Sequence, residues 1–282
     1  MKIDTDSLFI NIGGFLNTNL GDSWRKLPEE RLLSYIKSIA NVLSEYVNDH
    51  CYREMQREFY NSANTEFRIV FKQEVIAKTA LFVKKKKYSM WIVDEEGAST
   101  NKIKTTGLEI VRSDTPEVVR PMLKTIMEMI LKNRTDDEIL QIIDECKKKL
   151  HGVYPEEIAS NIGVSNLEKY ITVDGNAKKG TPSHVKAAIN YKKLLDILHI
   201  ADKYEEIQSG SKMKKVYLMK NQYGFDAMAF LRWPSEFDSI IQINYDKMIE
   251  KTFVSKINIL LDPMNKTELL NMCKENLGLF FV

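Results

Sequence analysis

Two aspartates near the start restrict this chain more than any other feature of its sequence. Asp4 and Asp6 are separated by one residue and precede the largely apolar run 8–12. Side chains two positions apart in an extended segment point to the same face, so both carboxylates can converge on divalent cations held against phosphates. Residues 4–7 are also typical of an ordinary polar turn, and both interpretations stay open at this point.

The segment before Asp4 is short for a strand. Three residues precede this aspartate, and three extended residues span at most about 10 Å. A hairpin that carries metal ligands in its turn needs a strand on each side. We therefore expect a second polypeptide to supply the missing strand beside residues 1–12 and to share the metal site.

The composition is that of a globular protein. Hydrophobic residues make up 44% of the 282 residues, and charged residues 28%. No run approaches the roughly 18 uncharged apolar residues of a membrane span, and the first residues lack a signal-peptide pattern, so we expect a cytoplasmic protein. The 3 cysteines are far apart, which argues against zinc and disulfide frameworks.

The positive charge of the chain is local. A formal net charge of +2 is too small for indiscriminate binding to nucleic acid. Lysines nevertheless cluster at 84–87, 147–149, 178–193 and 212–215. Each cluster alone is most often a solvated surface, but beside an acidic metal motif the clusters favour contacts to DNA.

The hydrophobic pattern predicts an α+β fold, with a mixed or antiparallel sheet and packed helices followed by a mostly helical region. A long helix follows Pro28, and strand-like runs cover 67–71, 75–83 and 88–93. From Thr115 the spacing becomes helical. The later predicted elements are helices at 118–131, 135–150 and 183–198, strands at 216–219 and 229–231, and helices near 245 and 267.

Two other chemistries use a similar acidic pair. A phosphatase-type nucleophile follows a hydrophobic strand that is missing here, and sugar-nucleotide transferases place the pair after a nucleotide-binding α/β half that this chain does not contain. A free-standing metal-dependent phosphotransferase would turn over its substrate as the isolated chain.

Further motifs recur along the chain in a fixed order. They are 4–7, Tyr52 to Met55, Lys85 to Tyr88, Lys104 with Gly107 to Glu109, Ser113 to Pro116, Ile158 to Ser160, Lys169 and Tyr170, Pro182 to Tyr191, Trp233 to Ser235, and Glu250 to Phe253. In this order the chain resembles the C-terminal part of family-B DNA polymerases of T-even-like bacteriophages over nearly its whole length. Residues 4–7 are similar to the second half of that family's YGDTDS motif.

The resemblance implies a domain organisation and a catalytic role. Residues 1–112 would form the C-terminal part of the palm, 113–270 the thumb, and 271–282 a tail. Asp6 would be the principal ligand and Asp4 its neighbour at two Mg²⁺ ions shared with a partner chain, with Glu74 close by. That partner would carry the exonuclease, the fingers and the rest of the palm of a split polymerase.

The resemblance also implies contacts to primer-template DNA and to dNTP. The residues implied in DNA binding are Lys85, Lys86, Lys87, Tyr88, Lys178, His184 and Lys186. Lys87 and Lys186 stand where the family usually has arginine, and lysine lacks the bidentate fork of arginine. The structural alternatives are a wet strand face for Glu74 and a partly packed helix start for His184.

The C-terminal tail carries a separate pattern. Leu277, Phe280 and Phe281 have the spacing of a peptide that binds a sliding clamp, in which a helical turn presents one aliphatic and two aromatic anchors. A terminal segment docked on its own domain would show the same pattern. The resemblance favours the clamp, and the competing function is a non-catalytic DNA-binding or clamp-tethering module.

Overall fold

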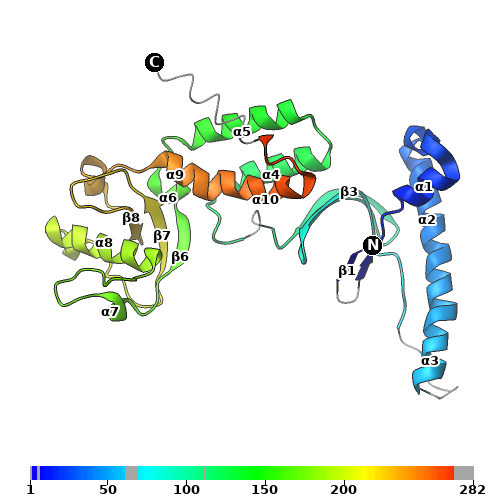
Figure 1. The fold of residues 1–282 in the computed structure, drawn as a ribbon, viewed down its shortest axis with the longest axis horizontal. Helices are drawn as coiled ribbons and strands as arrows, with labels where there is room; N and C mark the ends of the chain where they lie inside the picture. The colour runs from blue at the N-terminus through cyan, green and yellow to red at the C-terminus, as the bar shows by residue number, and fades with distance from the viewer. Residues whose placement is uncertain (1, 5–6, 61–68, 109, 111, 270–282) are drawn as a thin grey trace. The chain divides into compact units, whose positions relative to one another are not determined.

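The computed structural model describes residues 2–4, 7–60, 69–108, 110 and 112–269. The chain divides into two compact units, shown as a ribbon in Figure 1. Unit 1 comprises residues 1–78 and 91–103, and unit 2 comprises 79–90 and 104–282. The fold is α+β, as the hydrophobic pattern predicts.

Unit 1 begins with a short hairpin. Strand β1 (Lys2–Asp4) pairs antiparallel with β2 (Ser7–Phe9), and the register places Asp4 opposite Ser7. Three residues before the turn therefore do form a strand, whereas the second polypeptide expected beside them stays a prediction. A tight antiparallel hairpin needs only a few residue pairs, and these residues supply three.

The helices of unit 1 bury little apolar surface. Helix α2 is amphipathic, yet none of its 18 residues is buried. Among the described apolar residues of unit 1, only Leu16, Ile76 and Ile92 are buried. The helices are α1 (Gly13–Leu20), the 3-10 helix η1 (Gly21–Lys26), α2 (Glu29–Tyr46), the π-helix η2 (Val47–Tyr52) and α3 (Arg53–Tyr60).

The strand predicted over 67–71 is wrong where the structure describes it, at 69–71. The Asn48 side-chain amide donates to the backbone carbonyl of Phe71 at 2.8 Å, and its carbonyl accepts from the Phe71 N–H at 2.7 Å. The backbone groups that a strand ladder would use are therefore bonded to a helix side chain.

A three-stranded sheet runs through both units. Strands β3 (Val75–Lys84), β4 (Lys87–Glu95) and β5 (Ala98–Thr106) are hydrogen-bonded in that order. Each connection is a two-residue turn, which only antiparallel neighbours allow. The pattern predicts β3 and β4 but not β5, because β5 is mostly polar and exposed on both faces.

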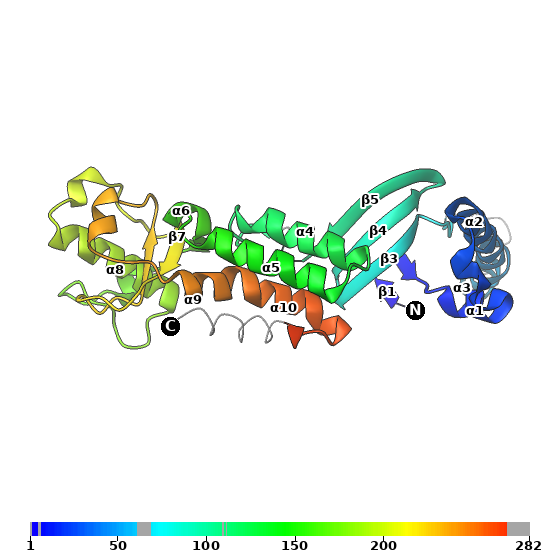
Figure 2. The same cartoon turned by 90° about the horizontal axis from the view of Figure 1, so that it is seen from above.

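Long helices build the core of unit 2. Figure 2 shows α4 (Val119–Leu131), α5 (Asp136–Leu150) and α10 (Ser255–Leu261) side by side. Asn133, at a φ of 53°, separates α4 from α5, and Thr135 with Glu138 forms a capping box that starts α5. Helix α9 (Tyr245–Ile249), the π-helix η6 (Glu250–Val254) and the 3-10 helix η7 (Asp262–Met264) flank α10.

The rest of unit 2 is a small antiparallel sheet covered by a helix. Strands β6 (Ser160–Gly163), β7 (Lys212–Tyr217) and β8 (Ala227–Phe230) pair in that order. Helix α8 (Ser183–Ile197) packs on β8, where buried Asn190 donates to the carbonyl of Ala227 at 2.9 Å. The shorter elements are α6 (Pro155–Ile158), α7 (Leu167–Tyr170), η4 (Ala201–Lys203) and η5 (Ser235–Ser239).

Two predicted strands are displaced from their observed positions. The strand predicted at 216–219 is β7, which starts at Lys212, and the one at 229–231 is β8, which starts at Ala227. The lysines of β7 hide its start, because only Met213 and Val216 within it are buried. In the described part of the chain, no helix is long and apolar enough to cross a membrane.

Candidate nucleic-acid interface

The connection between β3 and β4 presents a cluster of ammonium groups. Lys85 and Lys86 form the two-residue turn, and both are exposed, as is Lys84. Residues 84–87 are named the lysine turn. Within the described residues, the side chains of Lys85 and Lys86 make no ion pair and no hydrogen bond. Two unpaired cations at a hairpin tip suit the binding of phosphates.

The backbone of the lysine turn is strained and held from one side. Lys86 has a φ of 58°, a region that few residues other than glycine occupy. Gly107 packs against its carbonyl so closely that a Cβ at position 107 would lie 2.2 Å from the oxygen. Nearby, the buried Ser89 hydroxyl hydrogen-bonds the Thr105 hydroxyl at 2.8 Å. These contacts hold the backbone that carries the lysines.

Tyr88 continues the lysine turn as an aromatic surface. Its ring lies 5.6 Å from that of Phe82 on β3, with an angle of 42° between the ring planes. Tyr88 and Lys87 are both half-buried. The sequence-predicted set Lys85 to Tyr88 is thus brought together at one hairpin end, with two exposed lysines and two partly packed side chains.

The start of α8 is a second basic position in unit 2. Its N-cap, Pro182, makes no side-chain hydrogen bond, so the first backbone N–H groups have no capping partner from that residue. Half-buried His184 and Lys186 lie in the first turn, and Lys186 Nζ is 3.3 Å from Asp226 Oδ1. Lys215 donates to the Ser183 hydroxyl at 2.8 Å. The arrangement combines helix-terminal N–H groups with cations, as anion sites do.

Lys178 has a structural contact of its own. Its Nζ donates to the backbone carbonyl of Lys169 at 2.8 Å, and its N–H donates to the carbonyl of Tyr170 at 2.9 Å. These bonds close the loop before α8. The side chain therefore helps to shape the loop, although Lys178 and its neighbour Lys179 are both exposed.

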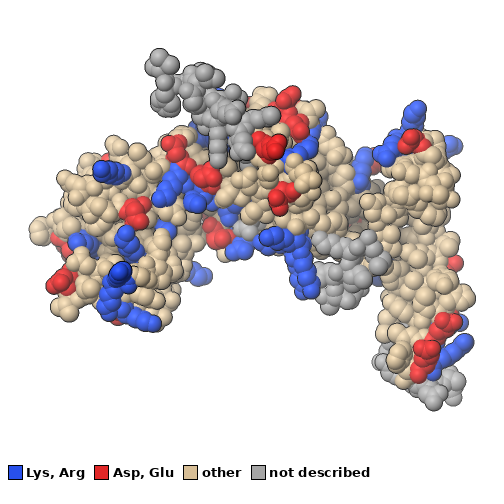
Figure 3. Space-filling model, in the orientation of Figure 1, with Lys and Arg blue, Asp and Glu red and all other residues tan. Residues whose placement is uncertain are grey.

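The structure also shows a feature that the sequence did not predict, a pair of cations over one ring. Lys215 Nζ lies 4.7 Å from the centroid of the Tyr217 ring, and Lys247 Nζ lies 4.4 Å from the same centroid. Figure 3 shows basic side chains around the α7 and α8 end of unit 2, with a few acidic ones among them. The alternation of lysine and tyrosine along 215–217 is the one local signal for this feature.

The structure describes two of the three predicted metal ligands, Asp4 and Glu74. Asp4 is the last residue of β1, and Asp6 lies outside the described residues. Glu74 is exposed, and its backbone carbonyl accepts from the N–H of Glu96 at 2.8 Å. No group of three or more His, Cys, Asp or Glu able to hold a metal occurs among the described residues. The clamp-binding set Leu277, Phe280 and Phe281 also lies outside them.

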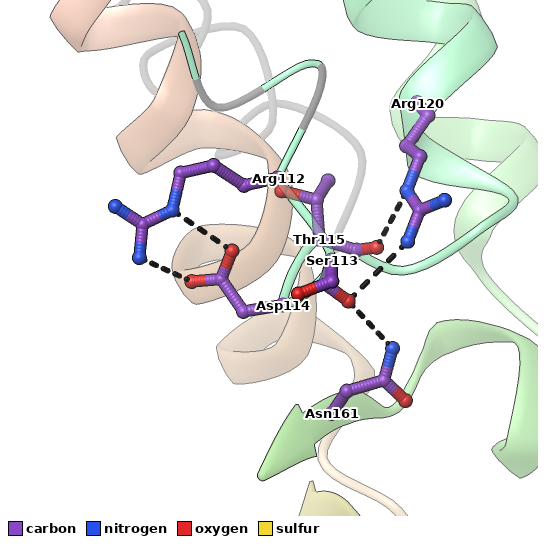
Figure 4. A network of polar contacts seen from close by, with 6 residues as sticks. All are labelled: Arg112, Ser113, Asp114, Thr115, Arg120 and Asn161. Carbon is purple, nitrogen blue, oxygen red and sulfur yellow. Dashed lines mark hydrogen bonds and ion pairs between the residues drawn. The ribbon is translucent and has the colours of Figure 1, made fainter. Parts of the chain in front are cut away.

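A polar network joins the turn after β5 to two other elements (Figure 4). Arg120 on α4 donates from Nε to the carbonyl of Thr115 at 3.0 Å and from Nη2 to that of Ser113 at 3.3 Å. Asn161 on β6 donates to the same Ser113 carbonyl at 2.7 Å. One turn is therefore bonded to both the helical core and the small sheet of unit 2.

An ion pair closes the other side of this turn. Both nitrogens Nε and Nη2 of Arg112 donate to the Asp114 carboxylate, at 3.1 and 3.3 Å. Burial raises the pKa of the Asp114 carboxyl, but the bonds from Arg112 and the charge of nearby Lys256 outweigh burial and hold this pKa below its ordinary value. The carboxylate is therefore charged at neutral pH.

The comparison with protein families identifies the chain. The model of DNA polymerase family B matches residues 36–264, which include most of both units. The chain belongs to DNA polymerase family B.

Several archaeal proteins named DNA polymerase are similar to it. The chain is 33% identical over 136 residues to one from Desulfurococcus sp. (strain Tok), covering 47% of this chain and 16% of that protein. It is 38% identical over 109 residues to one from Thermococcus sp. (strain 9oN-7), covering 38% and 12%. DNA polymerase 1 of Pyrococcus abyssi (strain GE5 / Orsay) is 30% identical over 160 residues, covering 56% and 16%. The chain thus matches less than a fifth of the length of these relatives.

Proposed function

We propose that this chain supplies the end of the palm and the thumb of a family-B DNA polymerase and takes part in template-directed addition of dNTP to a primer. The observation that carries the proposal is the lysine turn, where two unpaired exposed cations are held in a strained backbone by Gly107. Residues 1–112 are assigned to the palm, 113–270 to the thumb and 271–282 to a clamp-binding tail.

The DNA contacts follow from the chemistry of the two basic positions. Lys85 and Lys86 neutralise backbone phosphates, and Tyr88 offers a stacking and hydrogen-bonding edge close to them. At the start of α8, the backbone N–H groups with His184 and Lys186 take a second phosphate. Lys87 and Lys178 support these contacts from partly bonded positions.

Divalent metal fits the donor set at the hairpin. Asp4 ends β1, Asp6 follows it two positions later in the sequence, and both side chains bring only carboxylate oxygens, the ligands that Mg²⁺ prefers. Two bound Mg²⁺ ions would neutralise the phosphates at which the primer hydroxyl reacts. The role of this chain is then to hold Asp6 and Asp4, with Glu74 nearby, and to keep the duplex in register through the lysine turn.

The full activity requires the remaining polymerase parts. The apolar residues of α2 lie along one stripe, none of them is buried, and unit 1 holds only three buried apolar residues among those described. An amphipathic helix gains its stability from a covered apolar face. We assign that cover to the rest of the palm, carried with the exonuclease and the fingers by a partner chain. The partner adds a carboxylate to the metal site.

The cellular setting follows from this activity. The motif order favours a phage-type replicative enzyme, which would act on DNA in the cytoplasm of the host cell. The tail with Leu277, Phe280 and Phe281 would tether the enzyme to a sliding clamp.

DNA binding by the lysine turn is tested with Lys86→Gly in the full chain. Glycine accepts the positive φ of this position, so the turn keeps its shape while one cation is lost. Affinity for a primer-template duplex, measured by fluorescence anisotropy at several salt concentrations, should fall, and the slope of log affinity against log salt should decrease by about 1. Lys124→Ala, on exposed α4 surface, is the matched control and should change neither.

Catalysis is tested with Asp6→Asn in the chain assembled with its partner. Primer extension should be lost while duplex affinity stays, because the lysine contacts remain. Unchanged extension would refute the catalytic assignment. Duplex binding without extension by the assembled wild-type pair would instead support a non-catalytic DNA-binding or clamp-tethering module.

A further inference from the structure

A hollow of about 450 Å³ lies in unit 2 between the loop that joins β7 to β8 and the chain from the end of η5 to Gln242. This volume falls in the range typical of small-molecule sites, roughly 300–1,000 Å³. Most of the side chains that line it are polar. Those used below are Lys220, Asn221, Gln222, Tyr223, Asp238 and Gln242.

One wall of the hollow is rigid. The Asn221 side chain donates to the carbonyls of Met219 at 2.9 Å and Phe225 at 2.7 Å, and its oxygen accepts from the N–H groups of Tyr223 and Phe225. The amide nitrogen and the amide oxygen of Asn221 are thus both used to fix the loop. A preformed wall lowers the entropic cost of binding a ligand.

The same wall offers an aromatic face. The Tyr223 ring is stacked on the buried ring of Phe225, with centroids 5.7 Å apart and planes 21° apart. Tyr223 itself is half-buried and lines the hollow. A half-buried ring that is stacked on a buried one and lines a hollow can serve as a platform for a planar ligand.

The charged side chains of the hollow suit a ligand with one negative charge better than a ligand with several. The Lys220 ammonium makes no hydrogen bond or ion pair with any described residue. Across the hollow stands the carboxylate of Asp238, whose Oδ1 accepts from the Trp233 indole N–H at 2.7 Å. A single phosphodiester can pair with Lys220, whereas a triphosphate would bring four negative charges against one cation and a carboxylate.

We infer that this hollow binds one unpaired nucleotide of a single-stranded DNA segment. The base stacks on Tyr223, the amides of Gln222 and Gln242 supply donors and acceptors to its edge, and Lys220 takes the adjoining phosphodiester. The inference deepens the proposed function, because it assigns to the thumb a contact with the unpaired strand in addition to the duplex.

The test uses a fluorescein-labelled single-stranded oligonucleotide of about 12 nucleotides, bound by the full chain and followed by anisotropy. Tyr223→Ala should weaken binding about tenfold, because the stacking platform is lost. Tyr223→Phe keeps the ring and should bind like the wild type. Lys220→Ala should reduce the salt slope of binding by about 0.7, the value for one phosphate of a single strand.

Control variants and competitors separate the outcomes. Tyr154→Ala removes an exposed ring elsewhere in unit 2 and should leave binding unchanged. A 5-iodouracil base in the oligonucleotide should crosslink to the peptide that contains Tyr223. Oligonucleotide affinity that is equal in wild type and Tyr223→Ala would overturn the inference, as would displacement of the oligonucleotide by equimolar free dATP.

Failure of the inference about the hollow can be distinguished from failure of the proposed function. Duplex affinity that does not respond to Lys86→Gly counts against the polymerase assignment. Single-strand affinity that does not respond to Tyr223→Ala counts against the hollow alone, because the two residues lie at separate positions of unit 2.

Discussion

Gly107 and Lys86 are in backbone contact: a Cβ added to Gly107 would come within 2.2 Å of the Lys86 carbonyl oxygen. Both residues have positive φ angles, 63° for Gly107 and 58° for Lys86. Two positions of positive φ thus lie against each other at the end of the sheet, and only the absence of a side chain at position 107 allows it. The direction of the lysine turn depends on this contact.

Gly107→Ala is expected to displace the lysine turn. The added methyl group meets backbone, which cannot yield as a flexible side chain can, and the positive φ adds strain, for a combined cost of about 1–3 kcal/mol. Duplex affinity measured by anisotropy should fall together with the urea midpoint. Gly163→Ala, where nothing lies within 4 Å of the new Cβ, is the control. A variant that binds duplex like the wild type would show that the turn does not need this contact.

The buried carboxylate of Asp94 depends on Lys37. Their charged atoms are 2.5 Å apart, and the Asp94 side chain is fully buried while that of Lys37 is 33% exposed. Lys37→Met leaves the carboxylate without its cation and should destabilise the β4–β5 turn by about 3 kcal/mol. Asp94→Asn should cost less, because Lys37 can turn to water.

Hydrogen exchange measures this difference locally. The Gly97 N–H donates to Asp94 Oδ1 at 3.1 Å, so its exchange rate reports on the turn. Exchange should be fastest in Lys37→Met and intermediate in Asp94→Asn. The reverse order would mean that the ammonium, not the carboxylate, is the group that burial penalises.

Arg120 is expected to stabilise unit 2 through the two carbonyls that it binds. Its planar guanidinium reaches Thr115 and Ser113 at once, which a lysine cannot do in the same geometry. Arg120→Lys and Arg120→Ala should each lower the free energy of unfolding, the alanine variant by about 2 kcal/mol. Urea denaturation checks this. Arg134→Ala, at an exposed ion pair 3.7 Å from Glu138, should change it by less than about 1 kcal/mol.

Tyr191 is expected to make the protein sensitive to alkali. Burial, with a smaller contribution from Tyr204, raises the pKa of its phenol from the ordinary 10.0 to about 12 in the folded chain. Between these two values the unfolded state loses its proton first, so the free energy of unfolding falls as pH rises, by up to about 3 kcal/mol. Below the ordinary pKa of 10.0 the phenol keeps its proton in both states, and the full contribution of Tyr191 to the free energy of unfolding is present.

Urea unfolding of Tyr191→Phe at about pH 9 and about pH 11 tests this expectation. The variant cannot ionise at position 191, so its midpoint should fall less over this interval than that of the wild type. Tyr154→Phe, at an exposed ring, should behave like the wild type. Equal pH dependence in all three proteins would place the alkaline sensitivity at another group.

Local chemistry made several elements predictable. Apolar spacing together with Asn133, the Thr135 capping box and Pro182 sets the limits of α4, α5 and α8, since each signal acts within one turn of its own residue. The hairpin around the lysine turn is confirmed for the same reason, because a two-residue connection brings its strands together.

Contacts between distant residues were not predictable in this way. The loss of the strand near Phe71 depends on Asn48, 23 positions earlier. Strand β5 was missed for another reason, because its polar, exposed residues give no apolar alternation. Tyr217 gathers its two cations from β7 and α9. A side chain's partners across the fold are decided by packing, which local propensity does not encode.

The order of acidic, lysine-rich and aromatic motifs along the chain was enough to determine the family, because their residue types and spacing are read without any fold. Tertiary structure alone decided which of these residues face outward. Lys85 and Lys86 are exposed whereas Tyr88 beside them is half-buried, and the exposed Lys178 is bonded to the carbonyl of Lys169. Exposure depends on atoms brought close only when the chain is packed, so it is set by the fold and not by sequence position.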